Sequence, residues 1–211
     1  TDIALETGFT HAESFSRAFK QVFGVSPGEF RRQPEWQSWH SQMPVAPQIR
    51  REPAMQIAIV TLPDIPVAML LHHGSPETIH QTAARFVDWR KTSGFSPVRR
   101  YRTFGIAPDD PHHCDPQQFR FMIAGEVPAL IPEDNDFGVV NSVIPGGRCA
   151  TVRHHGSHER LTGLAQSLYR DWLPGSGETL RDFPLWFHYH NFIHEVAEHQ
   201  LVTDIFLPLK D

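Results

Sequence analysis

The sequence of 211 residues has only two cysteines, Cys114 and Cys149, and no long apolar run. Two cysteines in a chain of this length give no disulfide framework. A chain without a long apolar stretch offers neither a signal peptide nor a membrane span. We therefore expect free thiols, a cytoplasmic location and no membrane partner.

An excess of positive charge is also missing. The chain has 19 basic side chains against 24 acidic ones, which gives a formal net charge of -5. The chain as a whole therefore has no electrostatic attraction for nucleic acid, and any contact with DNA must be local.

Motifs for several kinds of catalysis are absent as well. The sequence has no serine–histidine–acid set, no glycine-rich phosphate loop and no HExxH spacing. The best-spaced metal candidates among the 14 histidines are His188, His190 and His194, with "HHCD" at 112–115 as a second group. Solvated or structural histidines are more common than ligands, so the sequence predicts no metal or other cofactor, and it does not favour an enzyme.

Proline is concentrated in residues 34–54, which contain four prolines and show neither helical nor strand periodicity. A segment of this kind predicts a linker. Residues 1–33 have helical periodicity, whereas residues 55–211 alternate strand-like apolar runs with two longer helical stretches. The sequence therefore predicts an α+β chain of two units joined by a linker.

The first unit has the outline of a helix-turn-helix, although a generic helical hairpin would show the same spacing. A short helix over residues 2–7 and a turn at Gly8 precede a second helix, which is predicted to begin at a Thr10–Glu13 capping box and to end at Gly24. The apolar stripe of this helix is formed by Phe15, Ala18, Phe19, Val22 and Phe23. The residues predicted to contact DNA on its other side are Glu13, Ser14, Arg17, Lys20 and Gln21.

The stretch "DIALETGFTHAESFSRAFKQVFGVSPGEFRR" resembles the second helix-turn-helix of AraC/XylS transcription regulators over nearly its whole length. The resemblance implies that Arg17 and Lys20 lie on the DNA-facing part of the second helix. Regulators of this family have two such motifs and this sequence shows one, so we expect a truncated regulator. Four basic and four acidic side chains nearly cancel within residues 1–33. We therefore expect the chain alone to bind DNA weakly or not at all.

Residues 55–211 contain an internal repeat. "HHGSPETIHQTAARFVDW" from His72 and "HHGSHERLTGLAQSLYRDW" from His154 start 82 residues apart, and each contains a serine suited to cap a helix. Each copy, over about 55–130 and 137–211, reads strand, helix, strand, strand. Two such copies predict a curved, mostly antiparallel sheet with both helices on one face and a groove between the halves.

Alternation along the strands predicts which side chains line this groove. Trp186 and His188 share one face of a predicted strand, and Phe104 and Ile106 stand at corresponding places in the first half. The alternative is that these aromatic side chains are ordinary core residues. The full predicted ligand-binding set is Phe104, Ile106, Phe121, His73, Trp186, His188 and Tyr189.

The repeated "HHGS", the "DW" helix ends and the terminal "FHYHN" and "QLVTDIFLPL" resemble the GyrI-like effector-binding domain from about Met55 to Leu209. The resemblance implies a small molecule bound between the halves, although some members hydrolyse cyclopropane-bearing natural products. Many members have a glutamate in the strand before the last, and His188 stands in its place here. A histidine is mostly neutral at pH 7 and does not attract a cation, so we expect a neutral or anionic aromatic effector.

The two resemblances imply a truncated AraC-family transcriptional regulator whose GyrI-like domain binds a small effector. The alternative is a GyrI-like hydrolase, or a protein that sequesters a toxic small molecule. A hydrolase would need an acid or base in the groove, and His188 is the candidate. Coupling between effector and DNA could run through docking of the first unit on the second, or through partner subunits as in a homodimer.

Overall fold

The computed structural model describes residues 12–32, 55–132 and 134–211. The chain divides into two compact units, Thr1–Ala54 (unit 1) and Met55–Asp211 (unit 2). None of the helices in the described residues is long and apolar enough to cross a membrane.

Some sequence predictions fall outside the described residues. They are the helix over residues 2–7 with its turn at Gly8, the Thr10 cap, and the linker over 34–54.

The described part of unit 1 consists of α2 (Ala12–Phe23) and α3 (Pro27–Arg32). Gly24 ends α2 as predicted, because it adopts φ +75°, where an L side chain would be strained, and donates its N–H to the carbonyl of Lys20 at 2.9 Å. A capping box starts α3: Ser26 Oγ accepts from the Glu29 N–H, and the Glu29 carboxylate accepts from the Ser26 N–H.

Phenylalanine rings hold the two helices of unit 1 together. The Phe19 ring lies 4.7 Å from that of Phe23, 5.8 Å from that of Phe15 and 5.9 Å from that of Phe30, measured between centroids. Phe19 therefore joins α2 to α3 through Phe30, and the charged and polar side chains Glu13, Arg17, Lys20 and Gln21 of α2 are exposed.

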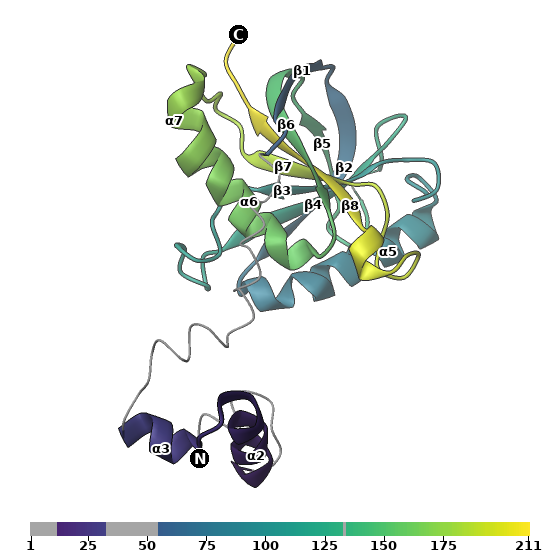
Figure 1. Cartoon of the computed structure of the whole chain (residues 1–211). Coiled ribbons are helices and arrows are strands. Elements are labelled where there is room, and N and C mark those ends of the chain that lie inside the picture. The colour runs from purple at the N-terminus through teal and green to yellow at the C-terminus, as the bar shows by residue number, and fades with distance from the viewer. Residues whose placement is uncertain (1–11, 33–54, 133) are drawn as a thin grey trace. The chain divides into compact units, whose positions relative to one another are not determined.

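Unit 2 contains one eight-stranded antiparallel sheet in the order β1-β6-β8-β7-β3-β4-β2-β5 (Figure 1). The strands are β1 (Ala58–Leu62), β2 (Ile65–His73), β3 (Thr103–Ala107), β4 (Arg120–Glu126), β5 (Val140–Ile144), β6 (Gly147–His155), β7 (Leu185–Tyr189) and β8 (Val202–Pro208).

The helices of unit 2 lie on one face of this sheet, as Figure 1 shows for α5 and α6. The first half has the 3-10 turn η1 (Pro76–Thr78) and α5 (Ile79–Ser93), and the second has a helix in four parts and a last turn: η2 (His158–Arg160), α6 (Leu161–Ser167), the π-helical η3 (Leu168–Trp172), α7 (Leu173–Ser176) and η4 (Glu198–Gln200). The predicted α+β class and duplicated fold are confirmed.

Residues 82 positions apart are structural counterparts in the two halves. Gly105 and Phe187 are such counterparts and also pair with each other across β3 and β7, so a pseudo-twofold axis passes between them. The same axis relates Asp64 to Gly146, where the Gly146 N–H donates to Asp64 Oδ1 at 2.6 Å. The sheet therefore curls into a half-barrel whose two hairpin turns meet.

The halves exchange their first strands. β1 belongs to the first copy but pairs with β6 of the second, and β5 belongs to the second copy but pairs with β2 of the first. This exchange is not part of the predicted strand–helix–strand–strand unit. It ties the copies into one sheet, so neither half can form all its strand pairs alone.

The "HHGS" motif is structural in both copies. Ser75 and Ser157 cap η1 and η2 as predicted, each accepting from the N–H two residues on. The first histidine of each motif is buried and its Nε2 lies within hydrogen-bonding distance of the serine carbonyl, at 3.1 Å for His72 and 2.9 Å for His154. These two histidines therefore fix the turn between strand and helix.

Three apolar clusters form the core of unit 2. One lies under α5 and includes Phe86 and Trp89, and another lies under α6 and includes Leu161 and Leu168. The third fills the inside of the half-barrel, on the face away from the helices. Its buried members are Ile65, Val67, Phe104, Ile106, Ala124, Ile144, Cys149, Trp186 and Phe206.

Candidate ligand-binding site

The two ends of the half-barrel interior carry opposite kinds of side chain. At one end, called the polar end below, the side chains are charged or imidazole: Arg102, Glu126, Arg153, His188, His190 and Asp204. Their counterparts 82 residues away form the apolar end: Pro184, Pro208, Leu71, Ile106, Pro108 and Met122. The same backbone therefore accommodates charged and imidazole side chains at one end of the interior and apolar side chains at the other.

A connected set of contacts holds the polar end. Arg153 donates Nε and Nη2 to the two oxygens of Asp204 at 2.7 and 2.8 Å. His190 Nε2 lies 2.7 Å from Asp204 Oδ2, and the rings of His188 and His190 lie 4.0 Å apart. His188 is also the cross-strand partner of Asp204, which is only 8 % exposed. Asp204 is therefore the centre of the cluster.

The protonation states follow from these contacts. Burial, together with the nearby His190 and Arg102, lowers the pKa of His188 from 6.5 to about 4, so this imidazole is neutral at pH 7. Burial alone would raise the pKa of Asp204, but the hydrogen bonds of Arg153 and His190 outweigh it, and the pKa of this carboxyl lies below its usual value. A hydrogen bond from Arg102 likewise lowers the pKa of Glu126.

A pocket of ≈ 390 Å³ opens beside the polar end, where β3 begins and β7 ends. It is called the strand-end pocket below. It is lined by Val98, Arg99, Arg100, Tyr101, Arg102, Thr103, His188, Tyr189, His190, Phe192 and Glu195. Its wall therefore combines guanidinium groups, imidazoles and aromatic rings with one carboxylate, Glu195, which accepts from the Phe192 N–H at 3.0 Å.

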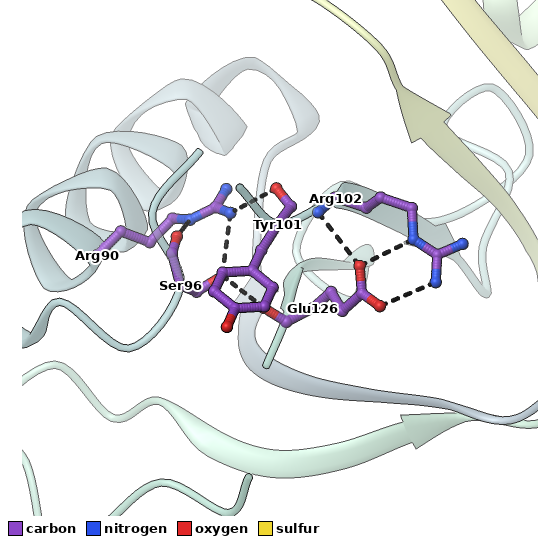
Figure 2. A network of polar contacts seen from close by, with 5 residues as sticks. All are labelled: Arg90, Ser96, Tyr101, Arg102 and Glu126. Atoms are coloured by element: carbon purple, nitrogen blue, oxygen red, sulfur yellow. Dashed lines mark hydrogen bonds and ion pairs between the residues drawn. The ribbon is translucent and has the colours of Figure 1, made fainter. Parts of the chain in front are cut away.

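The loop that forms one wall of the pocket is anchored by Arg90 of α5. The Arg90 guanidinium donates to the carbonyls of Ser96 and Tyr101 and to Ser96 Oγ (Figure 2). It also donates to Thr103 Oγ1 at 2.6 Å. Arg90 is 4 % exposed, and burial lowers its pKa to about 10, which leaves it charged at pH 7. A buried cation thus holds the arginine-rich loop in place.

Two of the arginines in this loop have no carboxylate partner among the described residues. Arg102 is held by Glu126 through two bonds of 2.8 and 3.0 Å, drawn in Figure 2. Arg99 and Arg100 form no such ion pair, and the Arg100 guanidinium lies 5.7 Å from the Tyr101 ring centroid. These two exposed cations are free to meet an anion.

The structure divides the predicted ligand-binding residues among several places. Phe104, Ile106 and Trp186 are 0–2 % exposed and belong to the packed interior of the half-barrel. In this conformation they have no open groove to line. His188 and Tyr189 line the strand-end pocket.

Phe121 and Tyr189 meet above Gly105, on the helix-bearing face. A Cβ at Gly105 would lie 2.5 Å from Phe121 Cζ and 2.8 Å from Tyr189 Oη, so only glycine leaves room for both rings. His188 points to the opposite face, because it precedes Tyr189 by one residue on β7. His73 is exposed at the end of β2, outside the pocket.

The residues predicted to contact DNA lie on one helix of unit 1. Glu13, Arg17, Lys20 and Gln21 are exposed on α2, and Ser14 is part of the same helix. The exposed side is opposite the phenylalanine stripe, as a DNA-facing helix requires.

Sequence reasoning missed most of the pocket wall. The loop from Val98 to Thr103 has no periodic pattern. The polar end beside the pocket was missed too, because Asp204 and Arg153 are isolated charges in strand sequences. A usable signal existed in the repeat. Aligning the copies at 82 residues places Asp204 against Met122 and Arg153 against Leu71, which marks these charges as departures from an apolar pattern.

A duplicated half-barrel with a pocket at one end has the architecture of a small-molecule binding domain. Residues 55–210 match the GyrI-like small molecule binding domain, and the chain belongs to this family. Residues 1–33 match a helix-turn-helix domain, which confirms the AraC-type motif predicted from the sequence.

Curated relatives include the probable transcriptional regulator YgiV of Escherichia coli K12. It is 44% identical over 155 residues, which cover 74% of this chain and 96% of the relative. The same protein from Escherichia coli O157:H7 is 43% identical over the same length.

Solved structures share the fold at low identity. The crystal structure of the EcmrR C-terminal domain has a TM-score of 0.62 and 17% identity, and covers 75% of this chain and 99% of that one. EcmrR in complex with DNA has a TM-score of 0.63 and 14% identity, and covers 99% of this chain and 76% of that one. An uncharacterized protein from Listeria innocua has a TM-score of 0.54 and 13% identity, covering 75% of this chain and 94% of its own.

Proposed function

We propose that this chain is a transcriptional regulator that responds to an aromatic, anionic small molecule. Unit 1 contacts DNA through α2, and the GyrI-like domain binds the effector in the strand-end pocket. The family match of both units and the name of the Escherichia coli relatives support the regulatory role.

The observation that carries the choice of effector is a pair of guanidinium groups in the pocket wall that form no ion pair with a carboxylate among the described residues. Arg99 and Arg100 lie in one wall with Tyr101, and Phe192 contributes a second aromatic ring. Guanidinium groups bind carboxylates through paired hydrogen bonds, and aromatic rings bind a flat apolar body. His188 is neutral at pH 7 and supplies no negative charge for a cationic ligand.

Calorimetric titration with aromatic carboxylates and their uncharged amide analogues tests this choice. We expect a carboxylate to bind at least about tenfold more tightly than its amide, and the double variant Arg99→Gln/Arg100→Gln to abolish the difference. Lys91→Gln is the control, because it removes an exposed cation from α5 outside the pocket. Equal binding of acid and amide to the unaltered chain would contradict an anionic effector.

Mobility-shift titration with and without the bound carboxylate tests the regulatory role. The four basic and four acidic side chains of residues 1–33 nearly cancel, so we expect weak binding with few phosphate contacts and therefore a shallow dependence on salt. Arg17→Ala removes an exposed cation of α2 and should weaken it further, while ligand binding to unit 2 persists. Ligand that binds with no effect on any DNA complex would argue against regulation.

A hydrolase is the second candidate, because His190 and Asp204 form an imidazole–carboxylate pair beside the pocket. Such a pair can orient a general base. Turnover of a cyclopropane-bearing compound that is lost in His190→Ala would favour the hydrolase over the regulator.

A further inference from the structure

We propose that His188, His190 and Asp204 form a binding site for a transition-metal dication, with Zn²⁺ as the best fit. The three ligand atoms lie within 4.8 Å of one another. This proposal does not depend on the identity or existence of the effector.

The placement of the three side chains follows from strand geometry. His188 lies in β7, and His190 follows the last residue of this strand, where its N–H donates to the carbonyl of Val202 at 3.0 Å and continues the pairing with β8. The extended backbone turns both imidazoles to the same side, with ring centroids 4.0 Å apart. Asp204 on β8 is the register partner of His188 and brings its carboxylate to within 2.7 Å of His190 Nε2. Two adjacent strands therefore present two imidazoles and one carboxylate around a common point.

This donor set selects the class of metal. Imidazole nitrogen suits Zn²⁺ and its first-row neighbours, whereas Ca²⁺ and Mg²⁺ need several oxygen ligands. Ligand atoms at about 2.0–2.1 Å from a tetrahedral zinc ion lie about 3.3 Å from one another. Small side-chain rotations that move the ligand atoms by about an ångström would therefore bring the three groups to this spacing. Three protein ligands leave a coordination position open, and His188 and His190 both line the strand-end pocket.

The cluster is not needed to build the fold. The first half has Ile106, Pro108 and Met122 at the three equivalent positions and forms the same strands. Burying a carboxylate costs desolvation free energy, whereas burying the apolar side chains of the first half at the equivalent positions does not. A binding role explains why the second half keeps polar groups that the same backbone does not require.

Arg153 competes with the metal. Its guanidinium holds both oxygens of Asp204, but the side chain is 56% exposed and can leave the carboxylate for solvent. Among the described residues of the polar end, the other guanidinium, Arg102, is neutralised by Glu126. Arg153 is therefore the group whose removal should strengthen metal binding.

Titration of the tag-free, metal-stripped full chain with Zn²⁺, followed by calorimetry, tests the site. The absorption bands of Co²⁺ report coordination number independently. We expect one tight site per chain, weakened at least about tenfold by Asp204→Asn and by His190→Ala. Arg153→Ala should raise the affinity by at least about threefold.

The control is His194→Ala, which removes an exposed histidine four residues from His190 and outside the cluster. It should leave the tight site unchanged. Thermal unfolding of each variant confirms that the fold persists. Zinc binding by His190→Ala/Asp204→Asn that equals that of the unaltered chain would overturn the proposal, as would Arg153→Ala weakening it. Loss of carboxylate binding with intact zinc binding would reject only the proposed effector.

Discussion

The two halves of unit 2 place different side chains on equivalent strand ends. Where the first half pairs Ile106 with Met122, the second pairs His188 with Asp204. Both pairs lie at an end of the half-barrel interior, and both are flanked by the same antiparallel neighbours. The backbone does not explain the difference, because it is the same in the two halves.

At a second place the first half is the polar one and the second half is apolar. Arg90 of the first half donates to Thr103 Oγ1 and to the loop after α5, whereas the counterpart of Thr103 is Leu185, which packs in the apolar cluster under α6. The first half is thus polar beside its helix and the second half is polar at its strand end. Both departures border the strand-end pocket, which is the physical reason to regard it as the functional site.

The largest expected effect concerns the interior of the half-barrel, where both halves place buried apolar side chains. Trp186 stacks on Phe206 with centroids 4.0 Å apart, while their counterparts are Phe104 and Ala124. Trp186→Ala should lower the free energy of unfolding by about 3–5 kcal/mol through the cavity it leaves.

Trp186→Phe restores the residue of the first half and should cost much less, about 1–2 kcal/mol. The buried Trp186 Nε1 has no hydrogen-bond partner in the described residues, so losing it leaves no acceptor unsatisfied. Urea denaturation of both variants measures the difference. Equal costs for the two would show that the ring does not fill the interior as described.

Arg90→Ala probes the polar network of the first half. It should cost about 2–4 kcal/mol, because the carbonyls and hydroxyls that Arg90 now satisfies lose a buried charged donor. It should also weaken ligand binding, since the loop over 96–103 loses its anchor. Lys91→Ala, one residue on and exposed, is the matched control and should change stability by less than about 0.5 kcal/mol. A change in stability with unaltered ligand binding would show that the loop does not contribute to the ligand-binding site.

His188→Ile gives the second half the residue of the first. In the unfolded chain a histidine titrates near pH 6.5, whereas burial holds the folded pKa of His188 at about 4. The unfolded chain therefore takes up a proton first as pH falls from 6.5 to 4, and stability is lost over this window by roughly 1–3 kcal/mol.

The isoleucine variant should lack this part of the pH dependence. Denaturation at pH 7, 5.5 and 4 in the presence of a chelator measures it. His155→Ile, at an exposed position on β6, serves as the comparison. An unchanged slope in His188→Ile would mean that other groups cause the acid destabilisation.

The sequence predicted the duplicated fold because the repeat leaves local signals. The "HHGS" turn, its capping serine and the apolar helix faces recur at 82 residues, and each reports structure within a few neighbours. The strand exchange left no such signal. β5 is short and has no clear alternation of exposed and buried residues, and its partner β2 lies some 70 residues away, so only the folded chain reveals the pairing.

The site was predicted only in part for a similar reason. Alternation correctly put Trp186 and His188 on one face, but it cannot tell a packed interior from an open groove. Whether a face is open depends on the opposite wall, and here the hairpin turns at Asp64 and Gly146 close the half-barrel. The loop after α5 became part of the site because the Arg90 side chain holds it through bonds to Ser96, Tyr101 and Thr103, and such side-chain contacts leave no periodic pattern in the sequence.

The smallest effect concerns the helix starts, where the halves nearly agree. Pro76 is the first residue of η1, and its counterpart His158 is the first of η2. Ser157 has ψ 137°, close to the 129° of Ser75, so the residue before His158 already has the extended backbone that a following proline requires. His158→Pro should therefore raise the free energy of unfolding by about 0.4–1 kcal/mol, because it restricts the unfolded chain without strain.

The gain should be slightly larger in acid. Burial, with a contribution from His154, lowers the pKa of His158, so that histidine costs stability as pH falls below its ordinary pKa, and proline removes the cost. Ala84→Pro, at an exposed position in the middle of α5, is the opposing control, because a proline there interrupts the helix and should cost about 3 kcal/mol or more. The His158 ring lies 5.1 Å from the Tyr189 ring, measured between centroids, and proline removes this contact. A loss of stability in His158→Pro would show that the contact outweighs the entropic gain. The two helix starts would then have the same geometry but different energies.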